Sequence, residues 1–385
     1  MNRLEKITIF NSPCERKEVV FSLDQERNIL VLTGYNGVGK SRVLSTLLEL
    51  MSLIHGVDYG EWSEDWLVKL EFEGGYNFHG IKIDTSGVIR KKGWEKSIRR
   101  ILENPKPLPA MFSSSMNAMM DTTSKKGFSS KQSDDENNIF CALQLNLEAK
   151  DKAKFASGLR AVGFINDRVV FGYKRDSEDS VFDRKELENS INKTLYVLIK
   201  EFVATEALRS DVEQDIDRYI NEFLSRQDDS KSKAELLKDT RDYVLEMMKH
   251  QDIYDKDEGK FSSNPVFVAI NNILALTTRK LVWKDALIGV ELQCGKFVPW
   301  THLSRGEKTL LALFLLVYLH RDGALFILDE PDLSLHLEWQ KMLLPSLLEL
   351  APTCQFIVAT HSPFLVMNTG SEQIVNMAKL VSQVA

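Results

Sequence analysis

Cysteine is scarce in this sequence, and long apolar stretches are missing from it. Only four of the 385 residues are cysteines. No two of them form a C-x-x-C pair, which excludes a disulfide framework and a cysteine-based zinc site. The apolar run LLALFLLVYLH is too short to cross a membrane, and the first ten residues lack the apolar core of a signal peptide. Together these features predict a soluble protein of the cytoplasm with no membrane partner.

Positive charge is also in short supply. The 49 lysines and arginines are outnumbered by 55 acidic residues, so the net charge is -6. Nucleic-acid-binding domains are usually basic, and the composition therefore argues against that class while leaving local basic spots open at 91–92, 99–100 and 125–126. The hydrophobic fraction of 43% is ample for a buried core. A chain of this length predicts about two or three domains, or one large interrupted domain.

Strands and helices alternate at both ends of the chain. An apolar strand at 28–34 leads through a glycine-rich turn into a helical pattern at 41–54. Near the other end, apolar strands at 324–328 and 355–360 flank a helical pattern at 337–350. This alternation predicts an α/β fold with a mostly parallel core sheet.

The middle of the chain lacks the alternation of strands and helices seen at the two ends. Residues 66–92 alternate as antiparallel β-structure, and the serine-rich residues 113–138 predict a mobile loop. A charged helical pattern at about 183–250 fits either an inserted arm or an ordinary helical subdomain. Residues 266–281 predict a helix, and residues 286–300 predict a hairpin.

These patterns predict three regions. Residues 1–182 are expected to form the N-terminal lobe of an interrupted α/β domain, and residues 183–263 a helical insertion. Residues 264–385 are expected to form the C-terminal lobe of the same domain.

Residues 34–41, GYNGVGKS, fit the phosphate-loop pattern G-x-x-x-x-G-K-[ST]. Glycines let backbone N–H groups turn inward around phosphates, and the following helix adds its positive dipole end. Lys40 supplies a cation for the β- and γ-phosphates, and Ser41 supplies a hydroxyl for Mg²⁺. We therefore predict that ATP and Mg²⁺ bind here. The expected contact residues are Gly34, Asn36, Gly37, Val38, Gly39, Lys40, Ser41 and Arg42.

Two carboxylates and a histidine follow apolar strands. Asp329 and Glu330 end the run LFILDE, and His361 follows the strand at 355–360. Ligands bind at the carboxyl ends of strands in open α/β sheets. Alone, the acidic pair would suit a solvated turn. Beside a phosphate loop, Asp329 is expected to hold Mg²⁺, Glu330 to activate the attacking water and His361 to contact the γ-phosphate.

Ser304 and Glu307 fit the capping-box pattern S-x-x-E before an apolar helix. The pattern allows two roles, which are closing the helix within the chain and contacting a phosphate held by another molecule.

Four motifs in order resemble those of ABC-type ATPases. GYNGVGKS, LSRGE, LFILDEP and ATHS resemble the phosphate loop, signature, Walker B and switch-histidine motifs. Together with DEPDLSLHLEWQ, they are most similar to the SMC, RecF and OLD branch. Within that branch they resemble the compact ATPases of bacterial anti-phage systems such as Septu, PARIS and retrons. The motifs cover only the two ends of the chain.

The resemblance implies a P-loop ABC-ATPase head that works as a homodimer or higher homo-oligomer. Two heads would sandwich two ATP molecules, and Ser304, Gly306 and Glu307 would approach the γ-phosphate held by the partner copy. Residues 332–336 match the D-loop at the dimer seam. They can also contain a helix N-cap at Asp332 or Ser334, and the two roles are compatible.

One feature of the family is missing from its expected place. The resemblance implies a Mg²⁺-sensing glutamine after a core strand between the phosphate loop and the signature. Gln132 and Gln144 do not fit that place.

We therefore expect an ATPase of an anti-phage defence system that controls a separate toxin or nuclease effector. The alternative is a RecF- or SMC-like ATPase of DNA repair or chromosome maintenance that binds DNA when ATP is bound. A transporter ATPase subunit fits less well, because that role does not require a long helical insertion.

Overall fold

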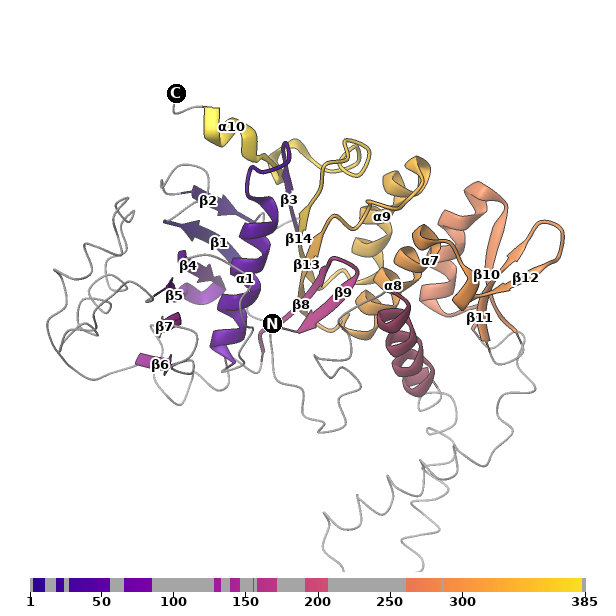
Figure 1. The fold of residues 1–385 in the computed structure, drawn as a ribbon, viewed down its shortest axis with the longest axis horizontal. Coiled ribbons are helices and arrows are strands. Elements are labelled where there is room, and N and C mark those ends of the chain that lie inside the picture. The colour runs from indigo at the N-terminus through magenta and orange to yellow at the C-terminus, as the bar shows by residue number, and fades with distance from the viewer. Residues whose placement is uncertain are drawn as a thin grey trace, which may run out of the picture. The chain divides into compact units, whose positions relative to one another are not determined.

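The computed structural model describes residues 3–10, 19–23, 28–55, 66–84, 128–132, 139–145, 155, 158–171, 191–206, 261–284 and 287–382. The chain forms two compact units (Figure 1), which are Met1–Ser190 with His320–Ala385, and Ile191–Leu319. None of the helices in these described ranges is long and apolar enough to cross a membrane. Most of the predicted helical pattern at 183–250, and all three basic spots, lie outside the described residues.

A six-stranded sheet forms the core of the first unit. Its strand order is β15-β3-β14-β13-β8-β9, and every pairing is parallel except the β8–β9 hairpin. Parallel strands are buried on both faces, which matches their uninterrupted apolar sequences. The predicted α/β fold with a mostly parallel sheet is therefore confirmed. The strands are β3 (Ile29–Thr33), β8 (Arg160–Ile165), β9 (Arg168–Phe171), β13 (Ala324–Asp329), β14 (Gln355–Ala359) and β15 (Ile374–Asn376).

The register of the parallel strands brings the two ends of the sequence together. Asp329 of β13 lies opposite Ala359 of β14, and Ala359 lies opposite Leu32 of β3. The residues that follow these three strands therefore meet at one edge of the sheet. Helix α9 (Leu337–Leu350) connects β13 to β14, and α10 (Met377–Ser382) follows β15.

A second, antiparallel sheet belongs to the same unit. Its order is β2-β1-β4-β5-β7-β6. Strands β4 and β5 confirm the antiparallel prediction for 66–84, whereas residues 85–92 lie outside the described ranges. The strands are β1 (Leu4–Ile9), β2 (Val19–Ser22), β4 (Trp66–Phe72), β5 (Tyr76–Asp84), β6 (Phe128–Gln132) and β7 (Ile139–Leu145).

The predicted mobile loop at 113–138 is wrong for residues 128–132. These residues form β6, the edge strand of the antiparallel sheet, and pair with β7. An edge strand needs only one partner for its backbone hydrogen bonds, so a polar sequence that cannot build a core can still form one. The remainder of the predicted loop lies outside the described residues.

Helix α1 (Lys40–Ile54) packs against both sheets (Figure 1). Its buried leucines share one hydrophobic core with strands of each sheet. Two glycines permit the close approach: a β-carbon at Gly80 would collide with Leu50, and one at Gly163 would collide with Leu48. The helix that begins at the phosphate loop is therefore fixed on two sides.

The second unit combines helices with a three-stranded antiparallel sheet. Residues 191–206 are helical, as the sequence predicts for this part of the charged region. The sheet order β10-β11-β12 confirms the predicted hairpin. The labelled elements are α7 (Pro265–Leu274), β10 (Arg279–Lys284), β11 (Leu287–Leu292), β12 (Phe297–Pro299) and α8 (Arg305–Leu319).

The helix predicted over 266–281 ends early. Helix α7 stops at Leu274, a 3₁₀ turn follows, and Thr278 adopts the left-handed conformation with φ of 55°. Residues from Arg279 onward then pair as β10. The prediction was wrong because β10 gains ladder hydrogen bonds that no local helical pattern reveals.

The predicted boundary at 263/264 separates a helical insertion from the C-terminal lobe. The second compact unit, Ile191–Leu319, extends across this boundary. Asn264 caps α7 and donates from Nδ2 to Glu206 Oε2 at 2.9 Å. The hydroxyl of Tyr318, near the end of α8, donates to Glu206 Oε1 at 2.7 Å. Phe202 also packs against Tyr318, with ring centroids 5.8 Å apart. Helix 191–206 is thereby joined to α7 and α8 within one unit.

Candidate nucleotide site

The phosphate loop has the backbone that its sequence predicts. Gly34, Gly37 and Gly39 have φ values of 136°, 82° and 90°, which side-chain-bearing residues rarely adopt. A β-carbon at Gly37 would meet nothing within 4 Å, so the loop is open at that point. Helix α1 begins at Lys40 without a side-chain cap on its first turn. This arrangement fits an anion bound at the start of the helix.

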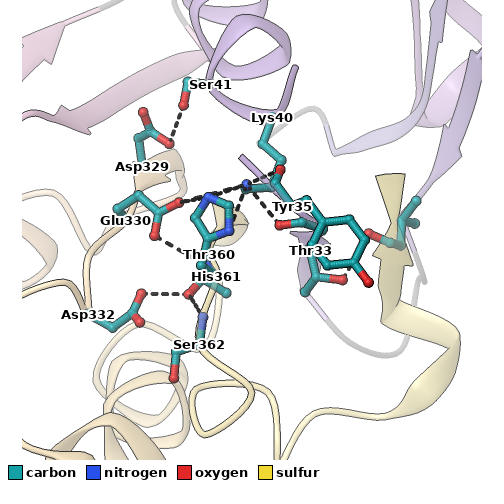
Figure 2. Close-up of polar contacts among 12 residues, drawn as sticks. Thr33, Tyr35, Lys40, Ser41, Asp329, Glu330, Asp332, Thr360, His361 and Ser362 are labelled. Atoms are coloured by element: carbon teal, nitrogen blue, oxygen red, sulfur yellow. Dashed lines mark hydrogen bonds and ion pairs between the residues drawn. The ribbon is translucent and has the colours of Figure 1, made fainter. Parts of the chain in front are cut away.

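Lys40 lies at the centre of the site (Figure 2). Its Nζ atom is 3.3 Å from the carbonyl oxygen of Gly34 and 2.6 Å from Nε2 of His361. It also lies 4.0 Å from Oε1 of Glu330. Burial lowers the pKa of Lys40, and the nearby carboxylates of Glu330 and Asp329 oppose that shift. The phosphate loop therefore holds a buried lysine between an imidazole and two carboxylates.

Ser41 and Asp329 form the candidate Mg²⁺ position. The Ser41 hydroxyl donates to Oδ1 of Asp329 at 3.0 Å (Figure 2). Burial raises the pKa of Asp329, and the hydrogen bond from Ser41 opposes the shift. No group of three or more acidic, histidine or cysteine side chains in the described part of the chain could hold a metal. A Mg²⁺ ion here would take its other ligands from phosphates and water, as is common for this ion.

Glu330 has a strained backbone and an unusual pKa. Its φ of 48° is left-handed, a conformation that costs a non-glycine residue about 1–3 kcal/mol. Oε2 accepts a hydrogen bond from the backbone N–H of His361 at 3.3 Å, and Oε1 lies 3.2 Å from His361 Nε2. Burial, followed by the charge of Asp332, raises the pKa of Glu330 to about 7. A carboxyl with this pKa can exchange protons near neutral pH.

The remaining predicted contacts of the phosphate loop lie around these groups. Asn36 is exposed, Val38 packs partly against the core, and Arg42 lies in the first turn of α1. The structure thus brings the phosphate loop, both carboxylates and His361 together at one sheet edge.

Ser304, Gly306 and Glu307 lie in the other compact unit. The capping box is confirmed there. Ser304 N–H donates to Oε2 of Glu307 at 2.8 Å, and Glu307 N–H donates to the Ser304 hydroxyl oxygen at 3.3 Å. The second Glu307 oxygen, Oε1, accepts from Nη1 of Arg279 at 2.7 Å. The arginine was not among the predicted residues.

The expected helix cap in 332–336 is wrong in detail. His336 caps α9, since its Nδ1 accepts from Glu338 N–H at 3.4 Å. The carboxylate of Asp332 instead accepts from the Thr360 hydroxyl at 2.7 Å. Burial raises the pKa of Asp332, and this hydrogen bond opposes the shift.

The core strand beside β13 is not followed by a glutamine. Strand β8 pairs with β13 and ends at Ile165, and the chain then turns back through Asn166 and Asp167 into β9. No glutamine stands in that turn or in β9. Gln132 and Gln144 lie on β6 and β7 of the antiparallel sheet.

Two solved SMC heads are similar to this chain at low identity. The SMC head domain from Thermotoga maritima is 13% identical, with a TM-score of 0.40, and the match covers 94% of this chain and 91% of that one. The Smc head domain with an extended coiled coil, bound to the C-terminal domain of ScpA, from Pyrococcus furiosus is 14% identical. Its TM-score is 0.39, and the match covers 100% of this chain and 98% of that one.

Two retron proteins are similar in sequence. The Retron Vc95 probable ATPase of Vibrio cholerae serotype O1 biovar El Tor is 23% identical over 378 residues, which cover 91% of this chain and 68% of the relative. The Retron Ec83 probable ATPase of Escherichia coli is 23% identical over 392 residues, which cover 93% of this chain and 68% of the relative.

A family model described as "AAA domain, putative AbiEii toxin, Type IV TA system" matches residues 29–368, which include the phosphate loop, the signature, both carboxylates and His361. The predicted resemblance to retron-associated ATPases is confirmed by the two retron relatives. Because the family model matches residues 29–368, the chain belongs to this AAA-domain family.

Proposed function

We propose that this protein binds ATP with Mg²⁺ at residues 34–41 and hydrolyses it to ADP and phosphate. One observation carries the proposal. Lys40 of the phosphate loop, Glu330 after β13 and His361 after β14 converge, with Nε2 of His361 2.6 Å from Lys40 Nζ and 3.2 Å from Glu330 Oε1. A cation, a carboxyl with a pKa of about 7 and an imidazole suit phosphate binding and water activation.

Each residue has a distinct role in this proposal. Lys40 and the first turn of α1 bind the β- and γ-phosphates, while Ser41 and Asp329 hold Mg²⁺, which neutralises phosphate charge. Glu330 accepts a proton from the attacking water as it approaches the γ-phosphorus. Burial and the neighbouring Lys40 lower the pKa of His361, which keeps its imidazole neutral near pH 7 and able to hydrogen bond with the γ-phosphate.

We further infer that the complete site contains two copies of the chain. In this arrangement Ser304, Gly306 and Glu307 of one copy approach the γ-phosphate held by the other. The positive dipole end at the start of a helix favours an anion, and the capping box orders the start of α8 for such a contact. The homodimer or higher homo-oligomer would then assemble in response to ATP.

We also propose a role in an anti-phage defence system, with a separate toxin or nuclease effector and action in the cytoplasm. The similarity to two proteins named as retron probable ATPases motivates this proposal. Affinity purification from cells that carry the neighbouring genes tests this role. A stoichiometric toxin or nuclease in the complex supports it. Duplex-DNA affinity that requires ATP and falls with salt, without such a partner, supports the RecF- or SMC-like alternative instead.

Glu330→Gln tests the hydrolysis proposal. Losing the general base should slow phosphate release by about 100-fold or more, while binding of ATP persists. The mass of this variant with ATP should be that of a dimer or larger. Normal turnover by Glu330→Gln would contradict the assignment of Glu330.

A further inference from the structure

Gln340 joins two segments that flank the nucleotide site. It lies in the first turn of α9, and its side chain is buried. Nε2 donates to the carbonyl oxygens of Asp332 at 3.1 Å and Leu335 at 3.0 Å. Oε1 accepts from the hydroxyl of Ser362 at 2.6 Å. One amide thus contacts both the segment after Glu330 and the residue after His361.

These bonds belong to a closed ring. The Thr360 hydroxyl donates to Oδ1 of Asp332 at 2.7 Å, and Ser362 N–H donates to the Thr360 hydroxyl oxygen at 2.9 Å (Figure 2). Gln340 closes the ring by bonding Ser362 on one side and Asp332 on the other. Asp332, Thr360 and Gln340 are all buried, so water competes poorly for these bonds.

The ring lies directly behind the proposed catalytic pair. Glu330 precedes Asp332 by two residues, and His361 lies between Thr360 and Ser362. Glu330 and His361 touch each other at 3.2–3.3 Å but belong to segments that follow different strands. Any change in the spacing of these segments would therefore change the distance between the carboxylate and the imidazole.

An amide side chain meets the requirements of this position. It can donate two hydrogen bonds to carbonyl oxygens while it accepts one from a hydroxyl. A carboxylate of the same shape would face two carbonyl oxygens without hydrogens, and methionine would fill the volume without the bonds. We propose that Gln340 is a positioning residue that sets the Glu330–His361 geometry and links residues 332–336 to the nucleotide site.

This inference rests on the proposed hydrolysis, and its test needs a control for simple destabilisation. Gln355 offers a matched control at the opposite end of β14. It is also buried, its Nε2 donates to the Leu4 carbonyl oxygen, and its Oε1 accepts from Leu4 N–H, both at 2.8 Å. Gln355→Met and Gln340→Met therefore each remove a buried, hydrogen-bonded amide, but only Gln340 borders the site.

The experiment measures kcat and KM for ATP, the Kd of a non-hydrolysable ATP analogue and the midpoint of urea unfolding. Both variants should unfold at lower urea. Gln340→Met should also lose about tenfold or more in kcat, because small displacements of reacting groups are costly. The analogue Kd should change by less than about threefold. Gln355→Met should keep the wild-type kcat.

A milder variant keeps the inference testable if Gln340→Met fails to fold. Ser362→Ala removes the hydroxyl that Gln340 accepts from, and should lower kcat without changing the analogue Kd. Added to Gln340→Met, it should lower kcat by a smaller factor than it does alone. The Gln340–Ser362 bond is then already absent, and only the acceptor of Phe364 N–H is newly removed.

Two results would overturn the positioning role. One is an unchanged kcat in Gln340→Met. If that variant does not fold, an unchanged kcat in Ser362→Ala has the same meaning. The other is an equal loss of kcat in Gln355→Met. If the wild type itself releases no phosphate from ATP, the proposed hydrolysis fails and the positioning role fails with it. If the wild type hydrolyses ATP and Gln340→Met does so at the same rate, only the positioning role fails.

Discussion

The Nε2 atom of His361 lies 2.6 Å from Nζ of Lys40 and 3.2 Å from Oε1 of Glu330. One ring nitrogen cannot serve both partners at once. It accepts a hydrogen bond from Lys40 when it carries no proton, and donates to Glu330 when it carries one. The protonation of His361 and Glu330 therefore determines which contacts hold Lys40 before the phosphates of ATP arrive.

Lys40→Ala should abolish ATP binding. Removing one partner of a buried charge pair costs about 2–5 kcal/mol, which is a loss of at least about thirtyfold in affinity. Isothermal titration calorimetry with ATP and Mg²⁺ measures the affinity of each variant. Lys6→Ala is the control, since this lysine lies on β1 and contacts Glu71 at 3.9 Å. Retained affinity in Lys40→Ala would remove the phosphate-loop assignment.

ATP hydrolysis should depend on pH through Glu330. Its pKa is raised to about 7, so the carboxyl is protonated below that pH and cannot accept a proton from water. A plot of kcat/KM against pH should therefore rise from pH 5 and level off above about 7, reflecting the free enzyme. The slow residual activity of Glu330→Gln should lack this acid limb. A wild-type profile that is flat from pH 5 to 8 would exclude Glu330 as the base.

Local sequence patterns predicted which residues meet at the edge of the parallel sheet. The strand–glycine loop–helix order placed Lys40 and Ser41, and the ends of apolar strands placed Glu330 and His361. The β8–β9 hairpin was not predicted, although its signal is present. Asn166 and Asp167 separate two apolar runs as a two-residue turn, and both have positive φ.

Long-range pairs explain the remaining gaps. Gln340 meets Ser362 across 22 residues, and Arg279 meets Glu307 across 28. No local period encodes such contacts, because strand register and helix packing create them. The end of α7 was missed for the same reason, because β10 forms there by pairing with β11.

The Arg279–Glu307 ion pair should stabilise the start of α8. Glu307 is 8% exposed, and its two oxygens bond Arg279 and Ser304. Arg279→Met leaves this carboxylate short of one charged partner, which should cost about 1–3 kcal/mol. Urea unfolding measures the loss. Adding Glu307→Gln, which keeps an acceptor for Ser304 but no charge, should recover most of it. Fully additive losses in the double variant would show that charge is not the cause.

A buried ion pair should hold α1 to the antiparallel sheet. Glu49 of α1 accepts from Lys82 Nζ at 3.1 Å and from Trp66 Nε1 at 2.6 Å, and both charged side chains are 7% exposed. Glu49→Ala should lower the free energy of unfolding by about 3–5 kcal/mol. The exposed pair Glu338–Lys341 provides the control, and Glu338→Ala should cost less than about 1 kcal/mol. Equal costs would contradict the assigned role of burial.

The central claim is that one copy of the chain binds ATP at residues 34–41 and that a second copy completes the site with residues 303–307. Mixing Lys40→Ala subunits with Ser304→Arg subunits and measuring phosphate release tests it most directly. We predict that each variant alone is inactive and that the mixture regains activity, because mixed dimers contain one intact site. A mixture as inactive as its components, with mixed dimers present by mass, would contradict the shared site.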